Sequence, residues 1–239
     1  MRVVMWSGPR NLSSAMMRSF GNRAATDVVD EPFYAAYLAA TGLDHPMREA
    51  VIASQPADWR EAARALAAPP PPGRLRYEKH MVQHMLPGMD FDWMEGAAVA
   101  FLIRDPREVA ASFGAKRAGY LESELGFARQ QEIFDLVAAR LGHPPPVVDA
   151  ADIRRDPRRV LSALCAALGL PFDEAMLGWA PGLRPSDGVW AAHWYGSLAD
   201  STGFAPPSDA PPPRLDPEVE RALRPAMESW RRLSETALR

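Results

Sequence analysis

The first twenty residues combine a short apolar run, a cluster of turn formers and an amphipathic segment. Residues 2–6 (RVVMW) predict a strand, and residues 7–11 (SGPRN) predict a tight loop. From Leu12 to Phe20 apolar side chains recur at the spacing of one helix face. A strand that passes through a short loop into a helix directs the free N–H groups of the helix start into that loop. The start of the chain therefore predicts a strand, a tight loop and a helix, in that order.

The predicted loop also collects groups that bind anions. The helix dipole places partial positive charge at the helix N-terminus, where the backbone N–H groups are free. Arg10 adds a permanent positive charge, and Ser13 and Ser14 add hydroxyl donors in the first helical turn. The candidate site for a phosphate-type group consists of Gly8, Pro9, Arg10, Asn11, Leu12, Ser13 and Ser14.

Strands and helices alternate along the rest of the chain. Further strands are predicted at residues 26–30, 75–79, 97–103 and 146–149. Helices are predicted at residues 33–40, 47–68 (with a break near Pro56), 106–113, 121–141, 157–168 and 217–238. This alternation predicts an α/β fold, a three-layer sandwich in which helices flank a central, mainly parallel sheet. Ligands of such sheets bind beyond the carboxyl ends of the strands. The loops expected at that edge follow Trp6, Asp30, Lys79 and Ile103.

Length and proline content bear on the domain organisation. A chain of 239 residues suits one large α/β domain, so residues 1–239 are expected to form a single domain. An irregular segment rich in aromatic residues and proline is expected at residues 180–215, before the last helix. The 24 prolines are about twice the average usage and cluster at residues 69–72, 144–146 and 206–213. These clusters predict rigid surface connections rather than domain linkers.

Composition argues against several classes of protein. No apolar run approaches the ~20 residues of a membrane span, and Arg10 interrupts the N-terminal run, so neither an anchor nor a signal peptide is expected. The single cysteine, Cys165, is expected to be buried and suits a cytoplasmic location. Five scattered histidines offer no zinc spacing, so no metal is expected. The net charge of −3 argues against nucleic-acid binding but permits a small anionic ligand.

A kinase-type phosphate loop fits the N-terminal motif poorly. That loop reads G-x-x-x-x-G-K-[ST], and its lysine reaches the terminal phosphates of the nucleotide. Gly8 opens such a window, but Ser13 and Ser14 occupy the positions of the second glycine and the lysine. A nucleotide kinase or NTPase with a degenerate loop is therefore kept only as an alternative.

The loop instead resembles the 5′-phosphosulfate loop of sulfotransferases, in which a Pro-Lys/Arg-Ser-Gly-Thr-Thr-like run joins the first strand to the first helix. Pro9, Arg10, Ser13 and Ser14 match this run. Leu12 departs from the pattern, because it stands where the family has a glycine.

A second motif supports the same resemblance. Residues 101–113 (FLIRDPREVAASF) are similar to the family's segment of strand, Arg, Asn/Asp-Pro, helix and Ser. In the family, the arginine and the serine eight residues later hold the 3′-phosphate of the nucleotide, and Arg104 and Ser112 have this spacing. Residues 147–157 resemble a further family segment to which we assign a structural role. Residues 188–195 resemble the Gly/Trp-containing segment that covers the nucleotide in the family.

The resemblance implies the P-loop NTPase-like fold of sulfotransferases and a donor, 3′-phosphoadenosine 5′-phosphosulfate (PAPS). It implies transfer of a sulfuryl group to a hydroxyl or amine of a small-molecule acceptor, with 3′-phosphoadenosine 5′-phosphate (PAP) as the product and no metal. Arg10 and the loop amides are then expected to stabilise the bridging and leaving oxygens. The sequence specifies neither the acceptor nor an oligomeric state.

Three residues are candidates for the general base that deprotonates the acceptor. Glu31 follows the second strand and resembles a glutamate that some sulfotransferases place there. His80 and His84 lie in a segment, expected to be a loop or short helix, that looks like the Lys-x-His region of other members, and they share one face if it is helical. Lys79 is an alternative contact for the sulfuryl group. The acceptor pocket is expected to be lined by Phe33, Tyr34, Tyr37 and residues 190–195.

One non-enzymatic alternative also stays open. A chain with this fold that has lost catalysis is expected to bind the nucleotide and to lack a carboxylate or imidazole near the sulfuryl position.

Overall fold

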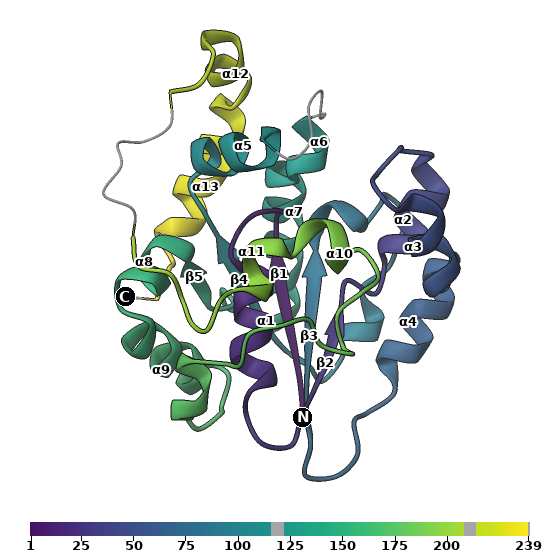
Figure 1. Cartoon of the computed structure of the whole chain (residues 1–239), viewed down its shortest axis with the longest axis vertical. Helices are drawn as coiled ribbons and strands as arrows, with labels where there is room; N and C mark the ends of the chain where they lie inside the picture. The colour runs from purple at the N-terminus through teal and green to yellow at the C-terminus, as the bar shows by residue number, and fades with distance from the viewer. Residues whose placement is uncertain (116–121, 208–213, 239) are drawn as a thin grey trace.

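The computed structural model describes residues 1–115, 122–207 and 214–238. Within them, five strands form one sheet in the order β2-β3-β1-β4-β5 (Figure 1). The strands are β1 (Arg2–Ser7), β2 (Thr26–Asp30), β3 (Leu75–Met81), β4 (Ala98–Ile103) and β5 (Val147–Asp149). Each pair of neighbouring strands runs parallel, which confirms the predicted α/β fold.

The helices of the described residues alternate with these strands. They are α1 (Ser13–Gly21), α2 (Tyr34–Thr41), α3 (Arg48–Ser54), α4 (Trp59–Ala67), α5 (Pro106–Gly114), α6 (Glu122–Leu125), α7 (Phe127–Leu141), α8 (Ala150–Arg155), α9 (Pro157–Ala167), α10 (Ala191–Trp194), α11 (Gly196–Ala199), α12 (Pro217–Ala222) and α13 (Arg224–Ser234). Three short 3-10 helices are η1 (Val82–His84), η2 (Asp92–Met94) and η3 (Glu174–Leu177).

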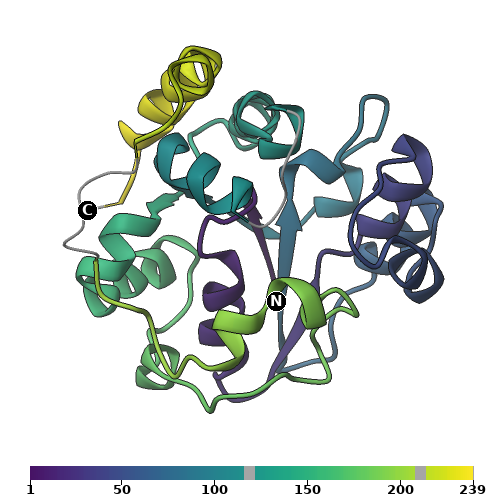
Figure 2. The ribbon, with the colours of Figure 1, turned by 45° about the horizontal axis from the view of Figure 1, so that its top comes forward.

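The sheet separates two hydrophobic cores, so the molecule has three layers (Figure 2). Because side chains alternate along a strand, Val3 and Met5 of β1 join a core with α1, α2 and α9. Val4 and Trp6 join the opposite core with α4, α7 and α13. Every residue of β1 is buried, as expected for a central parallel strand covered on both faces. Cys165 is buried in the first core, as predicted.

Two of the long helices predicted from the sequence are each divided in the structure. The helix expected over residues 121–141 is α6 and α7, separated by Gly126, and residue 121 lies outside the described part of the chain. Gly126 has a φ of 73°, and a Cβ there would lie 2.8 Å from the side chain of Val82, so only glycine fits. The helix expected over residues 217–238 is α12 and α13, because Pro225 lacks an N–H and its ring disfavours continuation from α12.

The segment around His80 also differs from its prediction. A loop or short helix was expected from His80 to Leu86, but β3 extends to Met81 and includes His80. Only Val82–His84 forms a 3-10 turn, so the two histidines do not share a helix face. The segment at 180–215, expected to be irregular, contains the short helices α10 and α11, and the proline cluster at 206–213 lies mostly outside the described residues.

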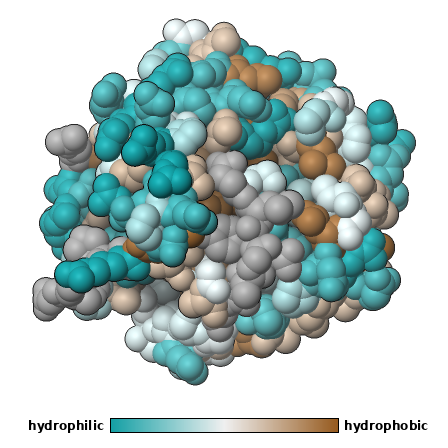
Figure 3. Space-filling view, turned by 90° about the horizontal axis from the view of Figure 1, so that it is seen from above, coloured by the Kyte–Doolittle hydropathy of each residue, from teal (hydrophilic) through white to brown (hydrophobic). Residues whose placement is uncertain are grey.

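The face of the molecule seen from above is mainly hydrophilic among the coloured residues, with only scattered hydrophobic areas (Figure 3). No helix in the described ranges combines the length and the apolar character needed to cross a membrane.

Glu78 is a fully buried carboxylate in β3. It accepts hydrogen bonds from Nε of Arg2 at 2.9 Å and from Nε of Arg76 at 2.8 Å, and Nε2 of His80 lies 3.3 Å away. Burial raises the pKa of Glu78, but the hydrogen bonds and charges of His80 and Arg2 outweigh it and lower the pKa to about 2. This ionised cluster therefore stabilises the fold above pH 4.5, the ordinary pKa, and the stabilisation is lost as the pH falls toward 2.

The substitution Glu78→Gln is expected to lower the free energy of unfolding at neutral pH by about 3–5 kcal/mol, because it leaves buried guanidinium groups without their carboxylate. Urea unfolding measures this loss, which is expected to shrink in acid. Glu49→Gln removes an exposed pair with Arg48 and is expected to cost less than about 1 kcal/mol. Equal losses of unfolding free energy in the two variants would contradict the stabilising role of the buried Glu78 cluster.

Candidate functional site

A pocket of about 330 Å³ lies at the edge of the sheet where the parallel strands end. It is lined by the loop after β1, the residue after β2, the end of β3, the residue after β4, the helix after β5, and the segment that contains α10 and α11. The loops expected to meet at this edge do so, because all five strands point the same way.

The loop after β1 has an unusual backbone that exposes the start of α1 to the pocket. Arg10 and Leu12 have φ values of 61° and 73°, in the left-handed region. Leu12 precedes α1, and no side chain caps the helix, so its first N–H groups are available on the pocket side together with Ser13 and Ser14. A glycine at position 12 adopts this conformation freely, whereas leucine pays about 1–2 kcal/mol.

Gly8 and Asn11 shape the loop from behind the pocket. A Cβ at Gly8 would lie 2.9 Å from the backbone oxygen of Leu125, so this close approach needs glycine. Nδ2 of Asn11 donates a hydrogen bond to the carbonyl of Leu102 at 3.2 Å. Neither residue lines the pocket, whereas Pro9, Arg10 and Leu12 do.

The structure brings Arg10, Arg104 and Ser112 together from positions far apart in the sequence. Nε of Arg10 donates a hydrogen bond to Oγ of Ser112 at 2.9 Å. Nη1 of Arg104 donates to the backbone oxygen of Arg10 at 2.7 Å, and its Nε donates to Glu108 at 2.8 Å. Burial and the charge of Arg104 lower the pKa of Arg10. Both arginines line the pocket. Ser112 does not line it, but its hydroxyl is hydrogen-bonded to Arg10, which does.

Arg154 of α8 lines the same pocket and was not among the residues singled out from the sequence. The available signal was the pair of arginines at 154–155, a few residues after the predicted strand that ends at residue 149. Sequence reasoning missed it because the segment was assigned a structural role.

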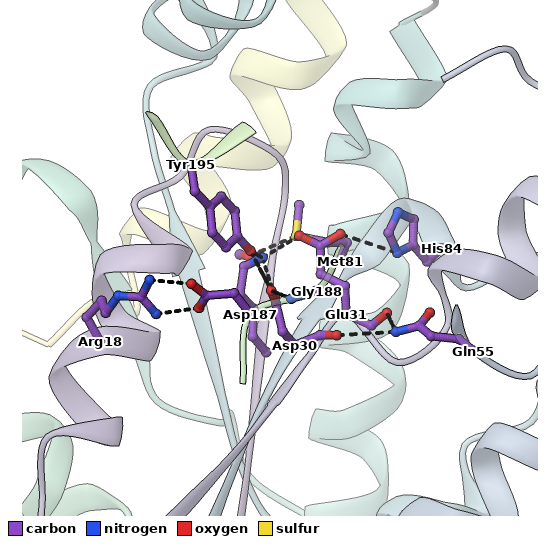
Figure 4. Close-up of polar contacts among 11 residues, drawn as sticks. Arg18, Asp30, Glu31, Gln55, Met81, His84, Asp187, Gly188 and Tyr195 are labelled. Atoms are coloured by element: carbon purple, nitrogen blue, oxygen red, sulfur yellow. Dashed lines mark hydrogen bonds and ion pairs between the residues drawn. The ribbon is translucent and has the colours of Figure 1, made fainter. Parts of the chain in front are cut away.

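At the other end of the pocket, Lys79 is buried between two carboxylates and a phenol. Figure 4 shows these three partners, Asp30, Glu31 and Tyr195. Its Nζ donates hydrogen bonds to Asp30 at 2.9 Å, to Tyr195 at 2.8 Å and to Glu31. The hydroxyl of Tyr195 donates to Oδ2 of Asp30 at 2.8 Å. The register of β2 on β3 places Asp30 directly beside Lys79.

These contacts determine the charge at this end of the pocket. Burial opposes the charge on Lys79, but Asp30 and Glu31 outweigh it and raise the pKa of Lys79 well above its usual value. Burial raises the pKa of Glu31, in part offset by Lys79 and reinforced by Asp30. One ammonium faces two carboxylates, and the Glu31 carboxyl binds a proton more readily than an ordinary glutamate does.

The two candidate histidines lie on opposite sides of the sheet edge. His84 lines the pocket, with its ring 4.5 Å from that of Tyr34 and its Nδ1 4.0 Å from Oε2 of Glu31. Burial, with the charge of His45, lowers the pKa of His84 well below its usual value. His80 does not line the pocket. It points to the opposite face of β3 and packs against Trp6, because neighbouring strand residues alternate between faces.

Only some of the aromatic residues predicted from the sequence line the pocket. Tyr34, Trp194 and Tyr195 line the pocket, whereas Phe33 belongs to the core on the other face of the sheet. His45 also lines it. Its Nδ1 lies 2.8 Å from the hydroxyl of Tyr34, and its Nε2 lies 2.9 Å from Glu124. His45 and Glu124 had no signal in the sequence, since neither belongs to a recognised motif.

Among the described residues, no group of three or more histidine, cysteine or acidic side chains is arranged to hold a metal. The expectation that no metal takes part stays a prediction.

The chain is similar to several known proteins. A family model described as a sulfotransferase domain matches residues 1–235. Two curated proteins of Arabidopsis thaliana, branched-chain-amino-acid aminotransferase-like proteins 1 and 2, are 38% identical over 210 residues and 35% identical over 209 residues. Each match covers 87% of this chain, but the chain spans only 37% of the length of either relative.

Two solved structures share the fold at low sequence identity. The sulfotransferase domain from the curacin biosynthetic pathway is 15% identical with a TM-score of 0.52, and the match covers 92% of this chain and 95% of that one. The sulfotransferase domain from the Synechococcus PCC 7002 olefin synthase is 18% identical with a TM-score of 0.50, over 97% and 94% of the two chains.

The substitution Lys79→Met is expected to lower the free energy of unfolding at neutral pH by about 3–5 kcal/mol, because two buried carboxylates lose their shared cation. At least one of them then has a folded-state pKa above its unfolded value, so the variant is expected to gain stability on acidification to about pH 5. Urea midpoints across this range measure the effect. Arg74→Met, which breaks an exposed pair with Asp27, is the control. If Lys79→Met changes the urea midpoint and its pH dependence no more than Arg74→Met does, Lys79 does not stabilise the fold through these carboxylates.

Proposed function

The chain belongs to the sulfotransferase domain family, and we propose that it transfers a sulfuryl group from PAPS to a hydroxyl or amine of a small-molecule acceptor. The observation that carries this proposal is the meeting of Arg10, Arg104 and the uncapped start of α1 in one pocket. A donor with phosphate groups at both ends needs positive charge at two separate points. The pocket supplies a helix N-terminus at one point and arginines at the other.

The residues present fit such a donor. Ser13, Ser14 and the N–H groups at the start of α1 would hold the 5′-phosphosulfate, and Arg104 with Ser112 would hold the 3′-phosphate. Arg10 lies between these two groups, because its side chain bonds Ser112 while its backbone belongs to the loop. Its guanidinium is therefore within the proposed site for both nucleotide phosphates and is not assigned to one of them alone.

When bound, PAPS supplies a sulfuryl group attached to a phosphate that leaves readily. The chain's contribution to such a transfer is to position the two reactants and to stabilise the negative charge that develops on the leaving phosphate. Arg10 and the free N–H groups of α1 are suited to that second task, because they are fixed before the reaction and partly shielded from water.

Glu31 is our proposed general base. It lines the pocket, and its raised pKa favours accepting a proton from an acceptor hydroxyl or amine. Lys79 holds the Glu31 carboxylate in place through a hydrogen bond and is itself held by Asp30. His84 is the remaining candidate, since its lowered pKa keeps it neutral and its ring borders Glu31. His80 is withdrawn because it faces away from the pocket.

The alternatives have less support. A nucleotide kinase or NTPase needs a lysine at the loop, and the pocket lysine in the described residues is instead paired with Asp30 and Glu31. A purely nucleotide-binding module does not need a carboxylate in the pocket, yet Glu31 is there. The aminotransferase wording in the relatives' names is not carried over, because the chain spans little more than a third of those proteins. A cytoplasmic location, suggested by the single cysteine, is retained as part of the proposal.

Calorimetry with PAP tests the nucleotide site. The wild-type protein is expected to bind PAP, and Arg104→Ala is expected to weaken binding about ten- to a hundredfold, because a charge-assisted contact to phosphate is lost. Arg107→Ala changes an exposed arginine in the first turn of α5, serves as the control and is expected to bind like the wild type. Absence of PAP binding by the wild-type protein would sink the proposal.

The role of Glu31 is tested by following conversion of PAPS to PAP with a panel of small phenols, alcohols and amines. Glu31→Gln is expected to lose turnover by at least about a hundredfold while it still binds PAP, because only proton removal is impaired. The wild-type rate is expected to fall in acid with an apparent pKa above 4.5, the ordinary value of a glutamate.

Glu61→Gln, an exposed change on α4, controls for the loss of a carboxylate elsewhere. If Glu31→Gln keeps its turnover and His84→Asn loses it, His84 is the base and the assignment of Glu31 is wrong.

A further inference from the structure

Arg154 is a cation in the pocket that has no part in the motifs or in the transfer described above. It lies in α8, which begins directly after β5. Because β5 lies beside β4 in the sheet, Arg154 and Arg104 follow the ends of neighbouring strands. Both side chains line the pocket, although fifty positions of sequence separate them.

The guanidinium of Arg154 lacks the partners that the surrounding arginines have. Its Nε is buried and has no hydrogen-bond acceptor among the described residues. The adjacent Arg155 is exposed and pairs with Asp152 on the same helix. Arg104 is paired with Glu108. The local carboxylates are thus engaged by other arginines, and the buried donor of Arg154 is left for a group that enters the pocket.

Charge in this part of the pocket favours the same conclusion. Burial and the charge of Arg104 lower the pKa of Arg154, in part offset by the charge of Glu108, and burial and Arg104 also lower the pKa of Arg10. Three guanidinium groups therefore gather in this part of the pocket, and among the described residues Glu108 forms an ion pair with Arg104. An anion between them would relieve the repulsion and satisfy the buried donor.

The number of arginines indicates what kind of anion fits. A phosphate that esterifies a single hydroxyl carries a charge of about −1.5 to −2 at neutral pH and three terminal oxygens. Several guanidinium groups can bind such a group at once, each through its fork of N–H donors. A ribose hydroxyl at the same position would offer one weak acceptor and no charge.

We propose that Arg154 is a specificity-determining residue for the nucleotide, which contacts its 3′-phosphate together with Arg104 and selects for nucleotides that carry this second phosphate. The inference rests on the proposed function, because it assumes that the pocket binds such a nucleotide. It adds a residue from α8, the helix after β5, to a site that the sequence motifs assign only to the segments after β1 and β4.

Calorimetry with two probes tests this role. PAP carries the 3′-phosphate, and adenosine 5′-phosphate is the same molecule without it. Arg154→Gln is expected to weaken PAP binding at least tenfold and to change the binding of adenosine 5′-phosphate less than twofold. Arg155→Gln, the exposed neighbour, is the matched control and is expected to leave both affinities unchanged.

The outcomes separate this inference from the proposed function. If the wild-type protein binds PAP and Arg154→Gln weakens both probes equally or neither, the specificity role is wrong while the proposed function stands. If the wild-type protein does not bind PAP, the proposed function itself fails.

Should Arg154→Gln not fold, Arg154→Lys keeps the charge without the fork of N–H donors. The preference of this variant for PAP over adenosine 5′-phosphate is expected to drop at least threefold. An unchanged preference in that variant overturns the inference.

Discussion

The buried contacts of Lys79 connect the parts of the molecule that make the pocket. Its ammonium bonds Asp30 from the neighbouring strand and Tyr195 from the segment that covers the site. Asp30 also accepts a hydrogen bond from the backbone of Gly188 at 3.2 Å, so the same carboxylate holds both the strand pair and the covering segment. A second buried pair, between Arg18 of α1 and Asp187, ties that segment to the first helix (Figure 4). A charge this deeply buried is tolerated only because each of these partners is present.

The strand order separates charge along the pocket. Carboxylates follow β2 on one side of β1, where Glu31 borders Lys79 and His84. Arginines follow β4 and β5 on the other side, where Arg104 and Arg154 lie. The loop after β1 lies between the two groups and presents the start of α1. In the proposed reaction, the anionic donor binds at the end with the arginines, and Glu31 accepts a proton at the other end. This division of charge suits the proposed transfer, because negative charge develops on the leaving phosphate near the arginines while the acceptor loses its proton to Glu31.

Local patterns in the sequence predicted most of the architecture. The strand, loop and helix at the N-terminus, the buried strand before Arg104 and the helix that begins at Pro106 all agree with the structure. These elements depend on hydrophobic period and on the φ restriction of proline, which short windows record. The prediction was wrong at His80, because β3 continues two residues beyond the expected end. Side chains alternate between the two faces of a strand, so as a strand residue His80 points to the face opposite Lys79 and out of the pocket.

The sequence by itself determined the class of fold, the strand, loop and helix at the N-terminus, and the spacing of Arg104 and Ser112, because each follows from patterns of neighbouring residues. Only the tertiary structure decided which side chains meet. The bond from Arg10 to Ser112, the cluster of Lys79 with Tyr195 and the place of Arg154 beside Arg104 join residues that are dozens of positions apart. Their meeting depends on the order of the strands and on how the last segment crosses the sheet edge. Hydrophobic periodicity carries no information on strand order, since every parallel arrangement of these strands buries the same faces.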